Sequence, residues 1–69
     1  MRGTVVTFDE ARGLGEIDAD GQRYPFHCTA IADGTRTIAV GAVVAFETRA
    51  GGLGRWEATA IEPASAGEG

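Results

Sequence analysis

The sequence predicts an all-β fold, a small five-stranded Greek-key barrel. Eleven glycines separate short apolar runs, which is the pattern of strands joined by turns. No window carries a helical apolar stripe of useful length. A long connection between the third and fourth runs favours a Greek key, and closure into a barrel would remove exposed sheet edges. An open SH3-like barrel is the structural alternative.

The first three strands are expected in the N-terminal part of the chain. Residues 3–8 (GTVVTF) are rich in β-branched side chains, which suit a pleated and half-buried surface. Residues 14–18 (LGEID) form the second strand, and Asp20-Gly21 suits a tight hairpin turn that leads to the third strand at 22–27 (QRYPFH). Pro25 cannot donate a ladder hydrogen bond, so the third strand is expected at a sheet edge or at a bulge.

The fourth strand is expected at residues 42–48 (AVVAFET), after a loop at 32–41. Alternation along this strand places Val44 and Phe46 on one face and Val43 and Ala45 on the other.

A glycine-rich hairpin loop leads to the fifth strand at residues 55–62 (RWEATAIE), which Pro63 stops. We therefore expect one domain over residues 1–63, followed by a flexible C-terminal tail at 64–69 (ASAGEG). The inward-facing positions are expected at Val5, Ile17, Tyr24, Phe26, Ile31, Val44, Phe46 and Ile61.

Composition narrows the class of protein. Hydrophobic residues make up 43% of the chain and charged residues 23%, which is typical of a soluble globular domain. No apolar run is long enough to cross a membrane and the N-terminus does not resemble a signal peptide, so a cytoplasmic location is expected. Cys28 and His27 are adjacent, and on a strand they would point to opposite faces, which argues against a metal site. We expect no cofactor.

Charge and size bear on the function. Six arginines, no lysine and ten acidic residues give a net charge of -4, which argues against strong binding of nucleic acid through phosphate contacts alone. The acidic residues are expected in turns and on the surface. Because a barrel this small has little room for a catalytic pocket, the protein is not expected to be an enzyme.

Four motifs follow one another along the chain: GTVVTF (3–8), RGLGEI (12–17), FHCTAI (26–31) and VGAVVAFET (40–48). Their order resembles that of the bacterial cold-shock domain. The family pattern begins Gly-Thr-Val-Lys-Trp-Phe, continues with Lys-Gly-Phe-Gly-Phe-Ile and Val-Phe-Val-His-Phe-Ser-Ala-Ile, and ends in a Gly-x-x-Val-x-Phe strand. The resemblance covers about residues 1–63. It implies an oligonucleotide-binding (OB) barrel that binds single-stranded RNA or DNA on the face of its second and third strands.

The departures from the family pattern fall on that binding face. Thr7 stands where the family has an exposed Trp, and other non-aromatic residues stand at further Phe positions. These are Leu14, Glu16, Pro25, Cys28 and, in the loop, Thr35. Because stacking of a base on an aromatic ring contributes about 1–3 kcal/mol, the loss of several rings predicts weak binding.

Seven residues are predicted to contact nucleic acid. Phe8, Arg12 and His27 keep the family's chemistry, and Leu14 offers apolar contact to a base. The other three are Arg36, Arg55 and Trp56. Arg23 is a further candidate for phosphate contact. Trp56 could instead cover the barrel end beside Leu53, and His27 could be a surface histidine bonded to a neighbour.

Two functions follow as hypotheses. The first is a cold-shock-like module that binds single-stranded RNA or DNA weakly or with altered specificity. The second is a cold-shock fold that contacts a protein partner or acts as a regulatory module without binding nucleic acid. A purely structural domain is a third alternative. A monomer or a weak homodimer is expected, since Val43, Leu53 and Trp56 could form a small interface.

Overall fold

The computed structural model describes residues 1–32, 34, 36–51 and 54–64. Its elements are all strands except for one short 3₁₀ helix: β1 (Arg2–Asp9), β2 (Leu14–Ala19), β3 (Gln22–His27), η1 (Cys28–Ala30), β4 (Val43–Ala50) and β5 (Trp56–Pro63). Each strand falls within a few residues of its predicted position, and the all-β, five-stranded prediction is confirmed. Within the described part of the chain, no helix has the length and apolar character needed to cross a membrane.

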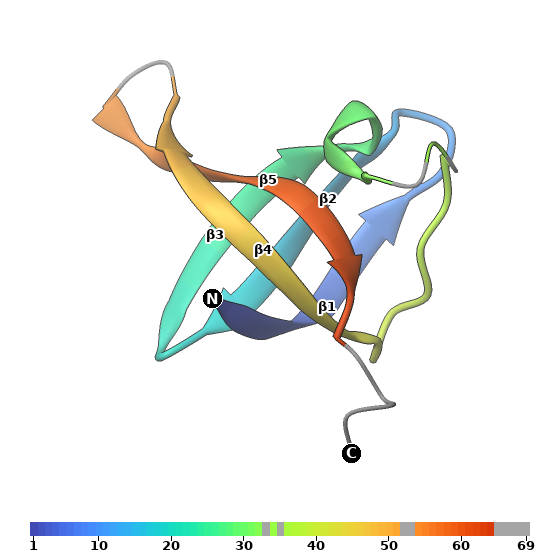
Figure 1. Cartoon of the computed structure of the whole chain (residues 1–69). Helices are drawn as coiled ribbons and strands as arrows, with labels where there is room; N and C mark the ends of the chain where they lie inside the picture. The colour runs from blue at the N-terminus through green and yellow to red at the C-terminus, as the bar shows by residue number, and fades with distance from the viewer. Residues whose placement is uncertain (33, 35, 52–53, 65–69) are drawn as a thin grey trace.

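The five strands form one antiparallel sheet in the order β3-β2-β1-β4-β5 (Figure 1). Strands β1 to β3 follow one another through short turns, and β4 returns after a long connection to lie beside β1. This spatial order, 4-1-2-3, defines a Greek key. The arrangement is consistent with a small OB-like fold.

The sheet is not closed, and in this respect the prediction of a closed barrel was wrong. Strands β3 and β5 are the two edges, and they approach each other without a hydrogen-bonded ladder between them in the described residues. Pro25 lies in β3 and has no N–H to donate, which hinders a ladder at that edge. The prediction that Pro25 marks an edge strand is confirmed.

The β2–β3 hairpin has the predicted two-residue turn. Ala19 pairs with Gln22, and Asp20 and Gly21 between them have φ values of 52° and 77°. Positive φ at both turn positions matches the right-handed twist of the two strands.

A bulge near Ala60 changes which side chains of β5 face inward. Ala45 pairs with Glu62 and Glu47 pairs with Thr59, so β5 has one residue more than β4 between these pairs, and Ala60 has a φ of 51°. Ala58 and Ile61 are therefore both buried although they are three residues apart. Equal strand parity would place Trp56, Ala58 and Ala60 together on the outside, yet Ala58 is buried, so this expectation is wrong for Ala58. The register is regular from Trp56 to Thr59, so the bulge changes the parity only beyond Thr59.

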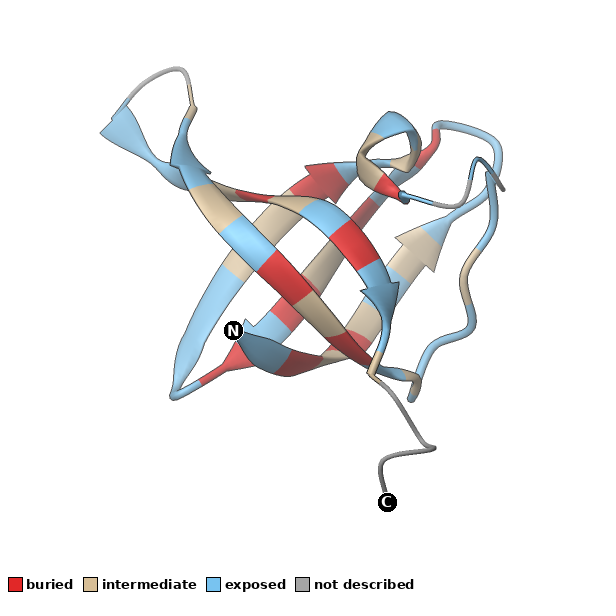
Figure 2. Ribbon diagram, in the orientation of Figure 1, coloured by how far each residue is buried: buried red, intermediate tan, exposed pale blue. Residues whose placement is uncertain are grey.

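The core lies inside the curled sheet, and every strand contributes to it (Figure 2). The buried cluster consists of Val5, Ile17, Ala19, Phe26, Val44, Phe46, Ala58 and Ile61. Ile31 is buried as well, and it bridges to Ile61. Tyr24 is half-buried with its ring 5.6 Å from that of Phe46. The predicted core is thus confirmed, with Tyr24 at its margin and two small alanines added.

Ala64 is the last residue that the structure describes, and its N–H donates to the carbonyl of Val43 at 3.0 Å. The remainder of the predicted tail, residues 65–69, lies outside the described residues, as do Thr35 and Leu53.

Candidate functional site

The outward face of β1, β2 and β3 carries five side chains that we call the platform: Thr7, Leu14, Glu16, Pro25 and His27. The strand register places them side by side, since Glu16 is opposite both Thr7 and Pro25, and Leu14 is opposite His27. Four of the five surround an open depression of about 380 Å³, and His27 stands at its end. At four of these positions, Thr7, Leu14, Glu16 and Pro25, the resemblance would place a Trp or Phe ring, and here none of the four carries one, whereas His27 matches the His of the family pattern.

Phe26 and Gly15 form the floor of the depression. A Cβ atom on Gly15 would lie 2.6 Å from Cζ of Phe26, so the phenyl ring passes directly beneath β2. The ring of Phe8 stacks on that of Phe26, with centroids 6.0 Å apart and planes 8° from parallel. Phe26 is only 4% exposed. Of the predicted site residues, Phe8 thus packs against the core instead of presenting its ring face on the platform.

The loop between β1 and β2 holds Arg12 at one end of the platform. Oδ1 of Asp9 accepts from the backbone N–H of Ala11 at 3.0 Å and of Arg12 at 3.3 Å. Gly13, with φ of 69°, accepts from the N–H of Cys28 at 2.7 Å through its carbonyl. This bond ties the loop to the residue that follows His27, so Arg12, Leu14 and His27 lie at the same end.

His27 is exposed, and one of its ring nitrogens is occupied. Nδ1 accepts from the backbone N–H of Thr29 at 3.2 Å and lies 2.9 Å from the Thr29 hydroxyl. Since Nδ1 acts as an acceptor, the neutral ring carries its proton on Nε2. This network fixes the ring and leaves an Nε2–H donor. The neighbouring Cys28 is half-buried, and its sulfur lies 3.9 Å from Nδ1.

Two arginines near this face form ion pairs with carboxylates. Nη1 of Arg23 lies 3.2 Å from Oε1 of Glu16, and Nε of Arg49 lies 3.5 Å from Oε1 of Glu57. Both pairs are exposed, so each contributes at most about 1 kcal/mol to stability. The first pair also affects binding. Because Arg23 is directed to the carboxylate of Glu16 on the platform, it is less available to a phosphate.

Trp56 and Arg55 lie in a separate depression, together with Gly54 and residues 22–24 of β3. Trp56 is 57% exposed, as its predicted role requires. The structure does not place these two residues on the platform. Whether Trp56 packs on Leu53 lies outside the described residues. Arg36 is exposed in the loop between η1 and β4.

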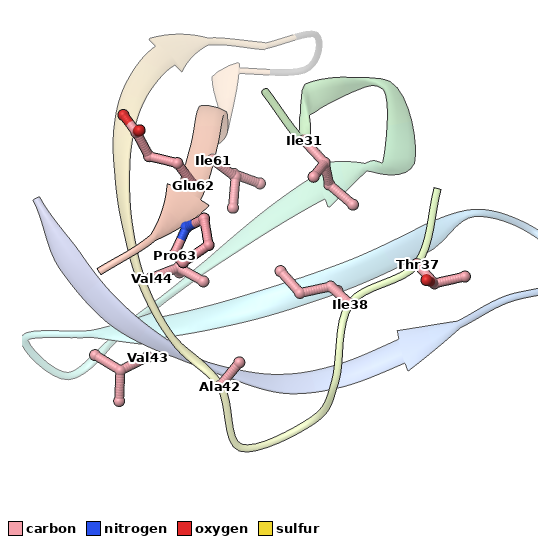
Figure 3. Close-up of a pocket in the computed structure, with 9 residues that line it drawn as sticks. All are labelled: Ile31, Thr37, Ile38, Ala42, Val43, Val44, Ile61, Glu62 and Pro63. Atoms are coloured by element: carbon pink, nitrogen blue, oxygen red, sulfur yellow. The ribbon is translucent and has the colours of Figure 1, made fainter. Parts of the chain in front are cut away.

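An apolar pocket that the sequence did not indicate lies between the loop that precedes β4, the start of β4 and the end of β5 (Figure 3). It has a volume of about 160 Å³, and the loop that precedes β4 covers it with Ile38, which packs against the core. The remaining lining comes from Ile31, Thr37, Ala42, Val43, Val44, Ile61, Glu62 and Pro63. The apolar run at residues 38–40 (IAV) is the only sequence signal for this pocket, and none of the seven predicted site residues lines it.

No group of three or more His, Cys, Asp or Glu side chains is arranged to hold a metal ion in the part of the chain that the structure describes. Comparison with models of known protein families and with curated proteins found no match for this chain.

Proposed function

We propose that the chain is a divergent cold-shock-like module that binds single-stranded RNA or DNA weakly or with altered specificity. The observation that supports this proposal is the convergence of Arg12, Leu14 and His27 at one end of an open β2–β3 face in a Greek-key sheet. Such a face offers one cation, one apolar side chain and one ring nitrogen donor within a short distance of each other.

The platform lacks the aromatic rings whose stacking on bases makes such surfaces bind tightly. Each aromatic ring that stacks on a base contributes about 1–3 kcal/mol, and 1.4 kcal/mol is a tenfold change in affinity. The described platform keeps apolar contact at Leu14 and Pro25, which exclude water from a base without a ring's π-face. Glu16 adds a negative charge that solvent and Arg23 screen in part. We therefore expect weak binding that depends on salt.

Fluorescence anisotropy of a labelled single strand of about eight nucleotides tests this proposal. The protein is titrated at about 50 mM and about 200 mM salt, because phosphate contacts lose strength as salt rises. We expect saturable binding at low salt that weakens at high salt, and weaker binding still to the matching duplex.

Two variants locate the contact. Leu14→Ser removes the exposed apolar side chain from the platform, and Val43→Ser makes a comparable change on β4, where Val43 is 54% exposed against 46% for Leu14. We expect Leu14→Ser to weaken binding several-fold and Val43→Ser to leave it unchanged. Absence of an anisotropy change for the unaltered protein at low salt would overturn the proposal.

Contact with a protein partner is the second candidate, and the depression around Trp56 favours it. An exposed Trp lies there with Arg55, Arg23 and Tyr24, and Trp, Tyr and Arg are the residues most enriched at energetic centres of protein interfaces. A capture experiment with and without nuclease separates the two functions. Partners that survive nuclease treatment but are lost in Trp56→Ala support this candidate.

A further inference from the structure

Glu16 occupies the centre of the platform, at a position where the resemblance would place an aromatic ring. Its direct neighbours across the strands are Thr7 and Pro25, and its side chain lines the depression together with Leu14. A base that enters this depression must meet the carboxylate. Glu16 therefore affects which bases the platform accepts as well as how tightly it binds them.

Arg23 orients this carboxylate. Its Nη1 lies 3.2 Å from Oε1 of Glu16, while the Glu16 side chain remains 38% exposed. A carboxylate only accepts hydrogen bonds, and two oxygens provide about four lone-pair sites, so Oε2 and part of Oε1 stay available. The guanidinium has five N–H donors, and those not directed to Glu16 lie beside it. The pair thus presents an acceptor next to a donor.

Bases differ in how well they can donate hydrogen bonds to a carboxylate such as that of Glu16. Cytosine, adenine and guanine carry an exocyclic amino group that donates N–H bonds, and carboxylates are known partners of the cytosine amino group. Uracil and thymine have only a ring N–H as a donor on this edge. It stands between two carbonyl oxygens, and these oxygens are repelled by a carboxylate. In single strands these edges are free to be read by hydrogen bonds. The donors of Arg23 would serve the ring nitrogen acceptor beside the amino group in cytosine or adenine.

We infer that Glu16, held by Arg23, makes the platform select bases with an exocyclic amino group over uracil and thymine. This inference rests on the proposed function, because it concerns the ligands of the same surface. Platforms built from aromatic rings tolerate any sequence, since every base has a π-face. Replacement of a ring by a carboxylate exchanges that tolerance for readout of a base edge.

The test compares octamers of deoxycytidine and deoxyuridine, which differ only at the base edge and are similar in size and stacking. At about 50 mM salt we expect the cytosine strand to bind roughly tenfold more tightly than the uracil strand, equivalent to about 1.4 kcal/mol. Glu16→Gln keeps the length of the side chain and adds a donor that suits the uracil carbonyl. We expect this variant to bring the ratio of the two dissociation constants close to one.

Glu47→Gln is the matched control, because it makes the same charge change at an exposed position of β4. It should keep the preference for cytosine. Equal binding of both strands by the unaltered protein would overturn the inference and leave the proposed function intact. Retention of the preference in Glu16→Gln would overturn it too, because the selection would then arise elsewhere. If neither strand binds, the proposed function itself fails.

Discussion

Restoration of two aromatic rings should convert this surface into a strong binder of single strands. Thr7 and Glu16 are directly opposite each other on β1 and β2, and both side chains line the platform depression. In the double variant Thr7→Trp and Glu16→Phe, the two rings would lie next to each other as a cross-strand pair. Each ring adds about 1–3 kcal/mol of stacking, so the lower limit for two rings is about 2 kcal/mol, or roughly 30-fold in affinity.

The fold should tolerate this change, because the Arg23–Glu16 pair that it removes is exposed and contributes about 1 kcal/mol at most. Ala45 and Glu62 form a cross-strand pair on β4 and β5, so Ala45→Trp with Glu62→Phe introduces the same two rings away from the platform. Anisotropy with one mixed-sequence octamer compares all three proteins. A gain smaller than tenfold for the platform variant, or an equal gain for the control, would show that the absence of rings does not account for the weak binding that we propose.

Three further predictions concern stability and are measured by thermal unfolding followed by circular dichroism. Gly15→Ala should lower the free energy of unfolding by about 1–3 kcal/mol, because the new Cβ would lie 2.6 Å from Cζ of Phe26; an unchanged Tm would contradict the described packing. Asp9→Ala should cost about 1 kcal/mol through its hydrogen bonds to the β1–β2 loop, and it should weaken octamer binding by disordering Arg12. Ile61→Val should cost about 0.5–1.5 kcal/mol, since Ile61 is fully buried, and a neutral result would place the core elsewhere.

Alternation of apolar residues was sufficient to predict the strands and most of the core. In β4 it placed Val44 and Phe46 inside and Val43 outside, as the structure shows, because that strand segment is regular. The Asp20-Gly21 turn could also be predicted from the sequence, since few residue pairs accept positive φ at both positions.

Irregular backbone limited the rest of the fold prediction. The bulge at Ala60 reverses the pattern of β5, and nothing about an alanine indicates a φ of 51°. Ala19 and Ala58 were missed as core residues because small side chains carry little hydrophobic signal. The open edge between β3 and β5 was missed because closure depends on backbone pairing that composition does not report.

The candidate site was predictable in its location and less so in its interactions. The resemblance placed Leu14 and His27 on one face, and the register shows that they are cross-strand partners. The Arg23–Glu16 pair joins residues that are not direct partners in the register, so a sequence pattern did not single it out. The stacking of Phe8 on Phe26 was missed because the family pattern suggested a role for Phe8 in binding.

Amide chemical-shift mapping of the unaltered protein with a single-stranded octamer tests the central proposal most directly, namely that a cold-shock-like core is combined with a nucleic-acid-binding face that carries no Phe, Tyr or Trp rings. We predict fast exchange with a dissociation constant in the micromolar range or weaker, and the largest shifts in the β1–β2 loop, at Leu14 and around His27. Nanomolar binding in slow exchange would contradict the claim, and so would shifts confined to Trp56 and its neighbours.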